Sequence, residues 1–296
     1  MSFVYAYQPL LDLLLINAGF ALSQYVVLRA GVFSIATPGI VAIGAYTAAI
    51  MMARHGISIW GAAAAATAAG LIVGYALSIP LARLRGPYQA IATLAFVQFV
   101  IAFAFYAEPL TGGAPGIDNI PKQVSTLGLL CCVAATVYVL SSINQTRLGR
   151  IFDALRQDEA VAASLGISIW FHHALAFALS GAIGGLFGAL QAGYVYAIEP
   201  QQYGFAMLTT TLAAVILGGR RSVWGPIAGA AIMTTLPELG RSLADNRLLV
   251  NGLLLTLIII FLPRGLVDGL LFMRDRRNDR AARDQASLKI QKTAQP

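Results

Sequence analysis

The residues of this chain best suited to polar chemistry are gathered in one short segment, residues 147–166, with the sequence RLGRIFDALRQDEAVAASLG. Its charged side chains carry both signs: Arg147, Arg150, Asp153, Arg156, Asp158 and Glu159. Long stretches without Asp, Glu, Lys or Arg lie on both sides of the segment. Such a charged segment must lie in water. Its mixed charge favours a protein partner, because an anionic lipid surface would repel its carboxylates. A helix that lies on the bilayer surface is the alternative.

Apolar residues recur through this segment at the spacing of a helix. They are Leu148, Ile151, Leu155, Ala162 and Leu165. This spacing predicts one amphipathic helix over residues 147–166, with the charged side chains away from the apolar stripe. Gly166 is well suited to end the helix, because glycine readily adopts the left-handed backbone found there.

The rest of the sequence gives little indication of catalysis or metal binding. Cys131 and Cys132 are adjacent within an apolar run, a spacing that suits neither a disulfide framework nor a metal site. His172 and His173 begin another apolar run, where interfacial histidines are ordinary and a proton relay is the alternative. The glycine-rich stretch 181–188 lacks the lysine of a phosphate-binding loop. We therefore expect a non-enzymatic protein that binds no cofactor or metal directly.

The composition indicates an integral membrane protein. The chain is 58% hydrophobic and only 11% charged, whereas about a quarter of the residues in soluble domains are charged. Its charge-free runs reach the ~20 residues that a helix needs to cross the hydrocarbon core. We predict an all-α, polytopic transmembrane bundle of about nine spans, with a range of about eight to ten. The spans are expected near residues 10–28, 32–53, 60–82, 86–107, 123–146, 167–190, 200–219, 222–238 and 248–263.

The distribution of basic residues predicts how the chain is oriented. With the N-terminus outside, all but four of the 20 Lys and Arg residues lie on the cytoplasmic side. The four outside are Arg54, Lys122, Arg241 and Arg247. The positive-inside rule favours this orientation, which places residues 147–166 and the C-terminus in the cytoplasm. Residues 1–273 are expected to form the membrane domain and residues 274–296 a polar cytoplasmic tail.

Glycines also recur at four-residue spacing within the apolar runs. The pairs are Gly70 and Gly74, Gly181 and Gly185, Gly184 and Gly188, and Gly225 and Gly229. Small residues at this spacing let helix backbones approach closely in lipid. We expect them to serve packing within the bundle rather than dimerisation.

Six segments together resemble the permease subunits of branched-chain amino-acid ABC importers. The charged segment GRIFDALRQDEAVAASLGI looks like the cytoplasmic loop of that family, and RLRGPYQAIATLAF resembles the signature of its LivM type rather than its LivH type. The other four are FSIATPGIVAIGAYTA, TGGAPGI, ILGGRRSVWGPIAGA and FLPRGL. They occur in the order found in the family, between about residues 29 and 266.

The resemblance implies a transporter assembled from several subunits in the bacterial inner membrane. Residues 147–166 would be the coupling helix that contacts an ATPase subunit, through Arg150, Asp153, Arg156, Asp158, Glu159 and Gly166. The expected partners are two ATP-binding cassette subunits, which use the ATP, a LivH-type permease that forms a heterodimer with this chain, and a periplasmic substrate-binding protein. The lipid bilayer surrounds them, and no nucleic acid is expected.

A polar substrate needs a path that shields it from lipid, and interrupted helices offer exposed backbone groups for this purpose. We expect one interruption near the middle of the second span and another at the start of the fourth. The candidate path residues are Thr37, Pro38, Gly39, Gly86, Pro87, Tyr88, Thr93 and Gln98. A packing kink and a helix N-terminus are the respective alternatives.

The substrate is less well defined than the family. Many relatives have Gly followed by His or Gln where this chain has Ala36 and Thr37, and Ser and an acidic residue where it has Leu208 and Thr210. We expect branched-chain or related amino acids, with urea, short amides or aromatic acids as alternatives. An ion-coupled secondary transporter is less favoured, because few ionisable groups lie within the spans.

Overall fold

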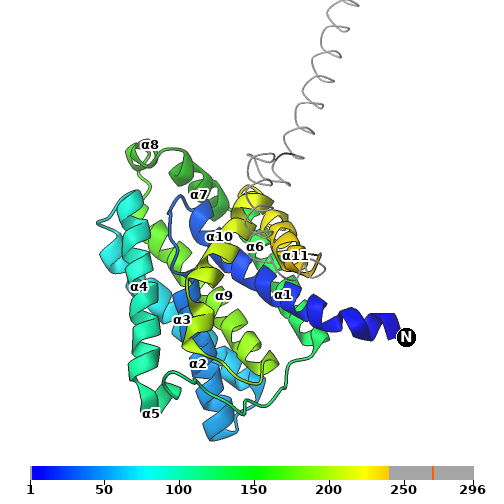
Figure 1. The fold of residues 1–296 in the computed structure, drawn as a ribbon. Coiled ribbons are helices and arrows are strands. Elements are labelled where there is room, and N and C mark those ends of the chain that lie inside the picture. Colours follow the sequence, from blue (N-terminus) through cyan, green and yellow to red (C-terminus); the bar gives the residue numbers. More distant parts are fainter. Residues whose placement is uncertain (1, 240–268, 270–296) are drawn as a thin grey trace, which may run out of the picture.

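The computed structural model describes residues 2–239 and residue 269, which form helices joined by loops (Figure 1). The helices are α1 Ser2–Arg29, α2 Thr37–His55, α3 Ile59–Leu81, α4 Pro87–Tyr106, α5 Glu108–Thr111, α6 Thr126–Gln145, α7 Arg147–Gln157, α8 Glu159–Ser164, α9 Ile169–Tyr194, the 3-10 helix η1 Pro200–Tyr203, α10 Phe205–Gly218 and α11 Trp224–Leu239. The predicted all-α bundle is confirmed for this part of the chain. The span expected at 248–263 and the tail at 274–296 lie outside the described residues.

Five of the described helices are long and apolar enough to cross a membrane. They are α1 from Gln8 onward, α3, α4, α6 and α9. α2 has 19 residues and is largely buried against α3 and α9. One predicted span is wrong, because residues 200–219 are divided into η1 and the 14-residue α10. Gly204 has extended backbone between the two helices, which interrupts the span that the charge-free run suggested.

Helix ends follow local capping chemistry. The Ser125 side chain accepts a hydrogen bond of 3.2 Å from the backbone N–H of Gly128 at the start of α6. Thr146 caps α7 in the same way, through the backbone N–H of Leu148. Such side chains satisfy N–H groups that have no partner within the helix. The Thr146 cap therefore sets where the charged segment separates from α6.

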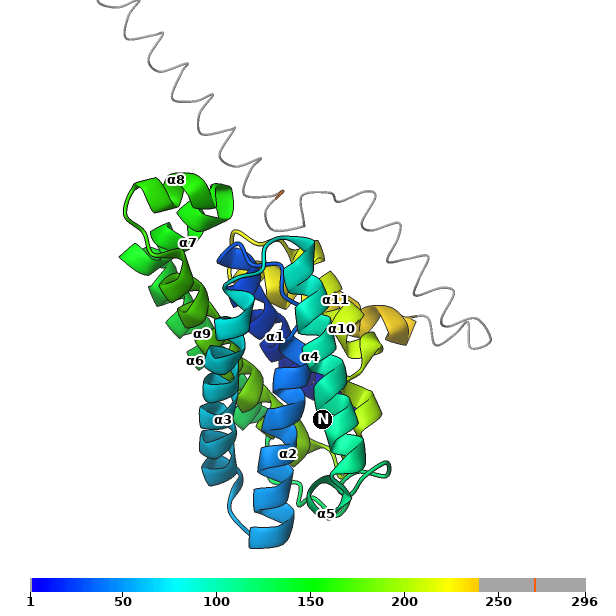
Figure 2. The same cartoon turned by 90° about the vertical axis from the view of Figure 1, so that its left-hand side faces the viewer.

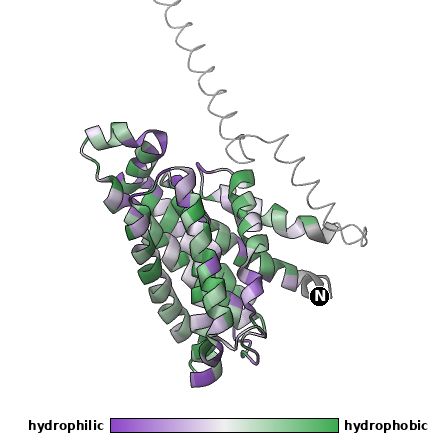
Figure 3. Ribbon diagram, turned by 60° about the vertical axis from the view of Figure 1, so that its left-hand side comes forward, coloured by the Kyte–Doolittle hydropathy of each residue, from purple (hydrophilic) through white to green (hydrophobic). Residues whose placement is uncertain are grey.

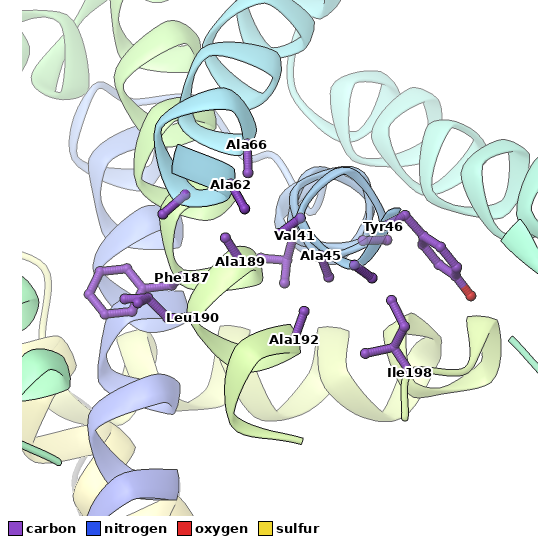
Figure 4. Packing of buried hydrophobic residues seen from close by; sticks show 14 of the residues in the cluster. Val41, Ala45, Tyr46, Ala62, Ala66, Phe187, Ala189, Leu190, Ala192 and Ile198 are labelled. Atoms are coloured by element: carbon purple, nitrogen blue, oxygen red, sulfur yellow. The ribbon is translucent and has the colours of Figure 1, made fainter. Parts of the chain in front are cut away.

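α9 lies at the centre of the bundle and packs against α1, α2 and α3. α3 and α9 approach closely, since a Cβ added at Gly70 would clash with the backbone carbonyl of Gly181. Small side chains such as Ala62, Ala66 and Ala189 fill the surrounding buried cluster (Figure 4). The predicted close packing of the glycine pairs within the bundle is thus observed, and it maximises van der Waals contact between helices.

Polar residues collect at two opposite ends of the bundle (Figure 3). The α7 end contains α7, α8 and the loops at 30–36, 82–86 and 219–223. The α5 end contains α5 and the loops at 112–125 and 195–204, which are joined by backbone hydrogen bonds between Ile117 and Ile198. Of the segments that charge distribution predicted to share one side of the membrane, those within residues 2–239 lie together at the α7 end.

Candidate functional site

The charged segment 147–166 forms two helices beyond the ends of the spanning helices (Figure 2). The prediction of one continuous helix over residues 147–166 is therefore wrong. Asp158 lies between α7 and α8 with φ −159° and ψ 113°, which is extended backbone. Its carboxylate accepts hydrogen bonds from the backbone N–H groups of Ala160 at 2.8 Å and Val161 at 3.1 Å. Asp158 therefore begins a new helix, because aspartate is a strong N-cap that competes with helix continuation.

Gly166 ends α8 as the sequence predicted. Its φ of +80° lies in the left-handed region that glycine tolerates. The N–H of Gly166 donates to the carbonyl of Ala163 at 2.9 Å, and the N–H of Ile167 donates to that of Ala162 at 3.2 Å. This pair of bonds is the Schellman motif, which satisfies the last carbonyl groups of a helix. The chain can then turn directly into α9.

The break at Asp158 changes which apolar residues are buried. Leu155 and Ala162 are 2% and 1% exposed, as expected for the apolar stripe. Leu165, predicted to extend that stripe, is 73% exposed because α8 does not continue the course of α7. Phe152, which the sequence analysis did not select, is 2% exposed and packs in a cluster with Tyr25 of α1. α7 is therefore attached to the bundle by an apolar face.

The opposite face of α7 and α8 forms a shallow hollow with a volume of about 570 Å³. Arg150, Asp153 and Asp158 line it together with the apolar side chains of Val161 and Leu165. Arg150 and Asp158 are exposed, and the predicted contact residue Glu159 next to them is partly exposed. Charged and apolar side chains in one concave surface are suited to a protein partner.

Asp153 has a partner inside this chain that the sequence did not reveal. Its Oδ2 lies 3.2 Å from Nη2 of Arg29, and its Oδ1 lies 3.7 Å from Nη2 of Arg156. The side chain of Arg29 is 7% exposed and that of Asp153 is 40% exposed. Two of the residues predicted to contact an ATPase, Asp153 and Arg156, therefore also take part in contacts within the bundle end.

A second polar group lies deeper, around the non-helical loop at residues 30–36. Nε2 of Gln24 donates to the carbonyl of Ser34 at 2.5 Å, and Oγ1 of Thr37 donates to Oε1 of Gln24 at 2.5 Å. Oγ1 of Thr93 accepts from the backbone N–H of Ile35 at 3.1 Å. All four of these residues are at most 2% exposed. We call Gln24, Ser34, Thr37 and Thr93 the polar core.

Thr37 begins α2 and does not interrupt a span, contrary to the prediction. The irregular backbone lies just before it, at residues 30–36, and Pro38 occupies the first turn of the helix. Proline is favoured there because the first helical N–H groups have no helical partner to lose. Gly39 follows in contact with α4, since an added Cβ would lie 2.9 Å from the Phe96 ring.

The eight predicted path residues divide into two groups. Thr37, Pro38, Gly39 and Thr93 lie together in and beside the polar core. Gly86, Pro87, Tyr88 and Gln98 are exposed on α4 and at its start, apart from this core. Gln24 and Ser34 of the polar core were not among the predicted path residues. A glutamine inside the apolar run 10–28 was the available signal, because an amide at that depth requires an internal partner.

α7, α8 and the polar core all lie within the residue range that one family model matches. A family model described as "Branched-chain amino acid transport system / permease component" matches residues 11–263. The chain belongs to this family. The resemblance carried by the six segments is therefore confirmed.

Individual relatives of this permease agree. The high-affinity branched-chain amino acid transport system permease protein LivM of Salmonella typhimurium is 31% identical over 263 residues, covering 77% of this chain and 62% of the relative. LivH of Escherichia coli is 24% identical over 155 residues, covering 51% of this chain and 50% of LivH. The fructose import permease protein FrcC of Rhizobium meliloti is 27% identical over 210 residues, covering 64% of this chain and 58% of FrcC. The higher identity and longer match favour the LivM type.

Proposed function

We propose that this chain is a permease subunit of an ABC importer for branched-chain or related amino acids. The LivM and LivH relatives are branched-chain amino acid permeases by name, and the chain spans 62% of the length of its LivM relative. The described helices provide apolar spans for a multi-pass membrane protein. In this proposal the chain forms the transmembrane path, and it does not hydrolyse ATP itself.

The observation that carries the proposal is the capped pair of helices α7 and α8. They project from the α7 end and present Arg150 and Asp158 in a hollow lined by charged and apolar side chains, with Glu159 next to it. We propose that the nucleotide-binding subunit of the transporter docks on this surface. Mixed charge would set the orientation of docking, while the exposed apolar side chains of Val161 and Leu165 would supply buried area.

The proposed assembly follows from this docking surface. The α7 end is cytoplasmic, in the bacterial inner membrane, and the C-terminus lies on the same side. Two ATPase subunits, one for this chain and one for a LivH-type permease, bind there and use the ATP. A periplasmic binding protein delivers substrate at the α5 end, where Glu108, Asp118, Lys122 and Glu199 supply polar groups.

The polar core is the proposed position of the substrate path through this subunit. Thr37 of α2 bonds to Gln24 of α1, and Thr93 of α4 bonds to the loop at 30–36. Relative movement of these elements would open or close a passage. Backbone groups of an irregular segment beside interrupted helices are also typical of transporter binding sites. Substitution of Thr37 by leucine is expected to reduce uptake while the complex still assembles.

A charge reversal at Glu159 tests the docking assignment. The complex is purified with its ATPase subunits, reconstituted in liposomes with the binding protein, and assayed for leucine uptake and ATP hydrolysis. Glu159→Lys is expected to lower uptake at least about tenfold, equivalent to ~1.4 kcal/mol. Coupled uptake at the full rate by this variant would contradict the proposed docking of the ATPase on α7 and α8. Uptake that persists without ATP and follows an ion gradient would instead indicate a secondary transporter.

A further inference from the structure

Arg29 is a residue at which several elements of the α7 end meet. It ends α1 and is 6% exposed, an unusual burial for an arginine. Its Nη2 pairs with Asp153 of α7 at 3.2 Å. Its Nη1 donates to the Tyr25 hydroxyl at 2.7 Å and to the carbonyl of Arg221 at 3.4 Å. One guanidinium group thus connects α1, α7 and the loop between α10 and α11.

The Tyr25 hydroxyl extends this network to a fourth element. It accepts a hydrogen bond of 3.2 Å from Nδ2 of Asn144 near the end of α6. The guanidinium carbon of Arg29 also lies 6.0 Å from the centre of the Tyr25 ring. Charged hydrogen bonds of this kind are stronger than neutral ones and are hard to separate in a buried site. Arg29 is therefore held from several directions.

The loop that follows Arg29 runs from this network to the polar core. Gly31, with φ +90°, lies so close to α7 that an added Cβ would be 3.1 Å from Cα of Arg156. Six residues later the chain reaches Thr37, whose side chain is bonded to Gln24. α7 is thus in direct contact with the loop that supplies backbone groups to the polar core. A displacement of α7 would therefore act on this loop.

We propose that Arg29 is a positioning residue that transmits movement of α7 into the bundle through its ion pair with Asp153. The inference rests on the proposed docking of an ATPase on α7 and α8, and it names the connection by which that docking acts. A buried guanidinium is costly to leave without its carboxylate partner. When the ATPase moves α7, Arg29 and the end of α1 follow it, together with the loop at 219–223.

The test uses the reconstituted transporter and measures the ATP molecules hydrolysed for each substrate molecule imported. Asp153→Asn and Arg29→Gln are each expected to raise this ratio at least about threefold, equivalent to ~0.7 kcal/mol, while the ATPase subunits still co-purify. The double variant is expected to be no worse than the more affected single variant, because both changes break one connection. Arg83→Gln removes an exposed arginine at the same end and is the matched control.

A purely structural ion pair would give a different pattern. Thermal unfolding would shift in the variants, while the ratio of ATP to substrate would stay at the wild-type value, and this result would overturn the inference. The inference would also be overturned if the increase in this ratio in the double variant were the product of the increases in the two single variants. If Arg29→Gln does not fold, Asp153→Asn decides alone, because that side chain is 40% exposed. Failure of Glu159→Lys to affect coupling would overturn the docking proposal instead, so the two failures are distinguishable.

Discussion

Removal of the Thr37 hydroxyl tests whether the polar core stabilises the bundle. Thr37 and Gln24 are each 2% exposed, and the hydrogen bond between them is 2.5 Å long. In Thr37→Val, Oε1 of Gln24 would lose this donor without access to water. A buried acceptor without a partner costs ~1–3 kcal/mol, whereas hydrogen bonds between membrane helices average ~0.6 and reach ~1.7 kcal/mol. For this short, buried bond we expect a loss of ~1–2 kcal/mol in the free energy of unfolding.

The assay is unfolding of the purified permease in mixed detergent micelles with increasing SDS. Thr47→Val is the matched control on the same helix, since the Thr47 hydroxyl bonds only to the carbonyl of Ile43, 2.7 Å away within α2. That carbonyl lies in a continuous helix, so the control is expected to change stability by less than ~0.5 kcal/mol. A double-mutant cycle with Gln24→Leu should show coupling of ~1 kcal/mol between Thr37 and Gln24. Equal losses in the two valine variants, or zero coupling in the cycle, would refute the reasoning.

Three further predictions concern the ends and the centre of the bundle. Asp158→Ala should destabilise the start of α8 by ~1 kcal/mol, measured as faster hydrogen exchange in that helix, and unchanged exchange would contradict the capping role. Gly70→Leu should prevent recovery of folded protein, because its side chain would enter the Gly181 backbone, whereas Gly128→Ala meets only ordinary contacts and should be tolerated. Ala163→Cys, at an exposed position of α8, should react with a membrane-impermeant thiol reagent only from the cytoplasmic side of inverted vesicles. Labelling from the periplasmic side would contradict the proposed orientation.

The sequence predicted the helical class and most spans because long charge-free runs have few alternatives in a membrane. It failed at residues 200–219, where the run without charged residues continues across Gly204 although the helix does not. The prediction of one helix over residues 147–166 failed for a related reason. The apolar spacing continues past Asp158, but the capping preference of this aspartate ends one helix and begins another. Periodicity reports which face is apolar. Local capping chemistry decides where that face ends.

The candidate site was only partly accessible to sequence reasoning, for reasons of distance along the chain. Asp153 and Arg29 are 124 positions apart, and no periodicity or spacing rule relates residues so far separated. Thr37 was selected because it adjoins Pro38 and Gly39, but its actual partner, Gln24, lies on another helix. Side chains that pair across helices become visible only when the helices are placed.

The burial of Arg29 gives the positive charge at the end of α1 two roles that reinforce each other. Counted as a basic residue beside a span, it favours one orientation of the chain in the membrane. Buried against Asp153 and the Tyr25 hydroxyl, it also requires α7 to lie over that same end of the bundle. A guanidinium that has lost contact with water is stable only with its partners in place. Arg29 therefore contributes both to the orientation of α1 and to the position of the proposed docking helix, so a change at Arg29 should disturb both.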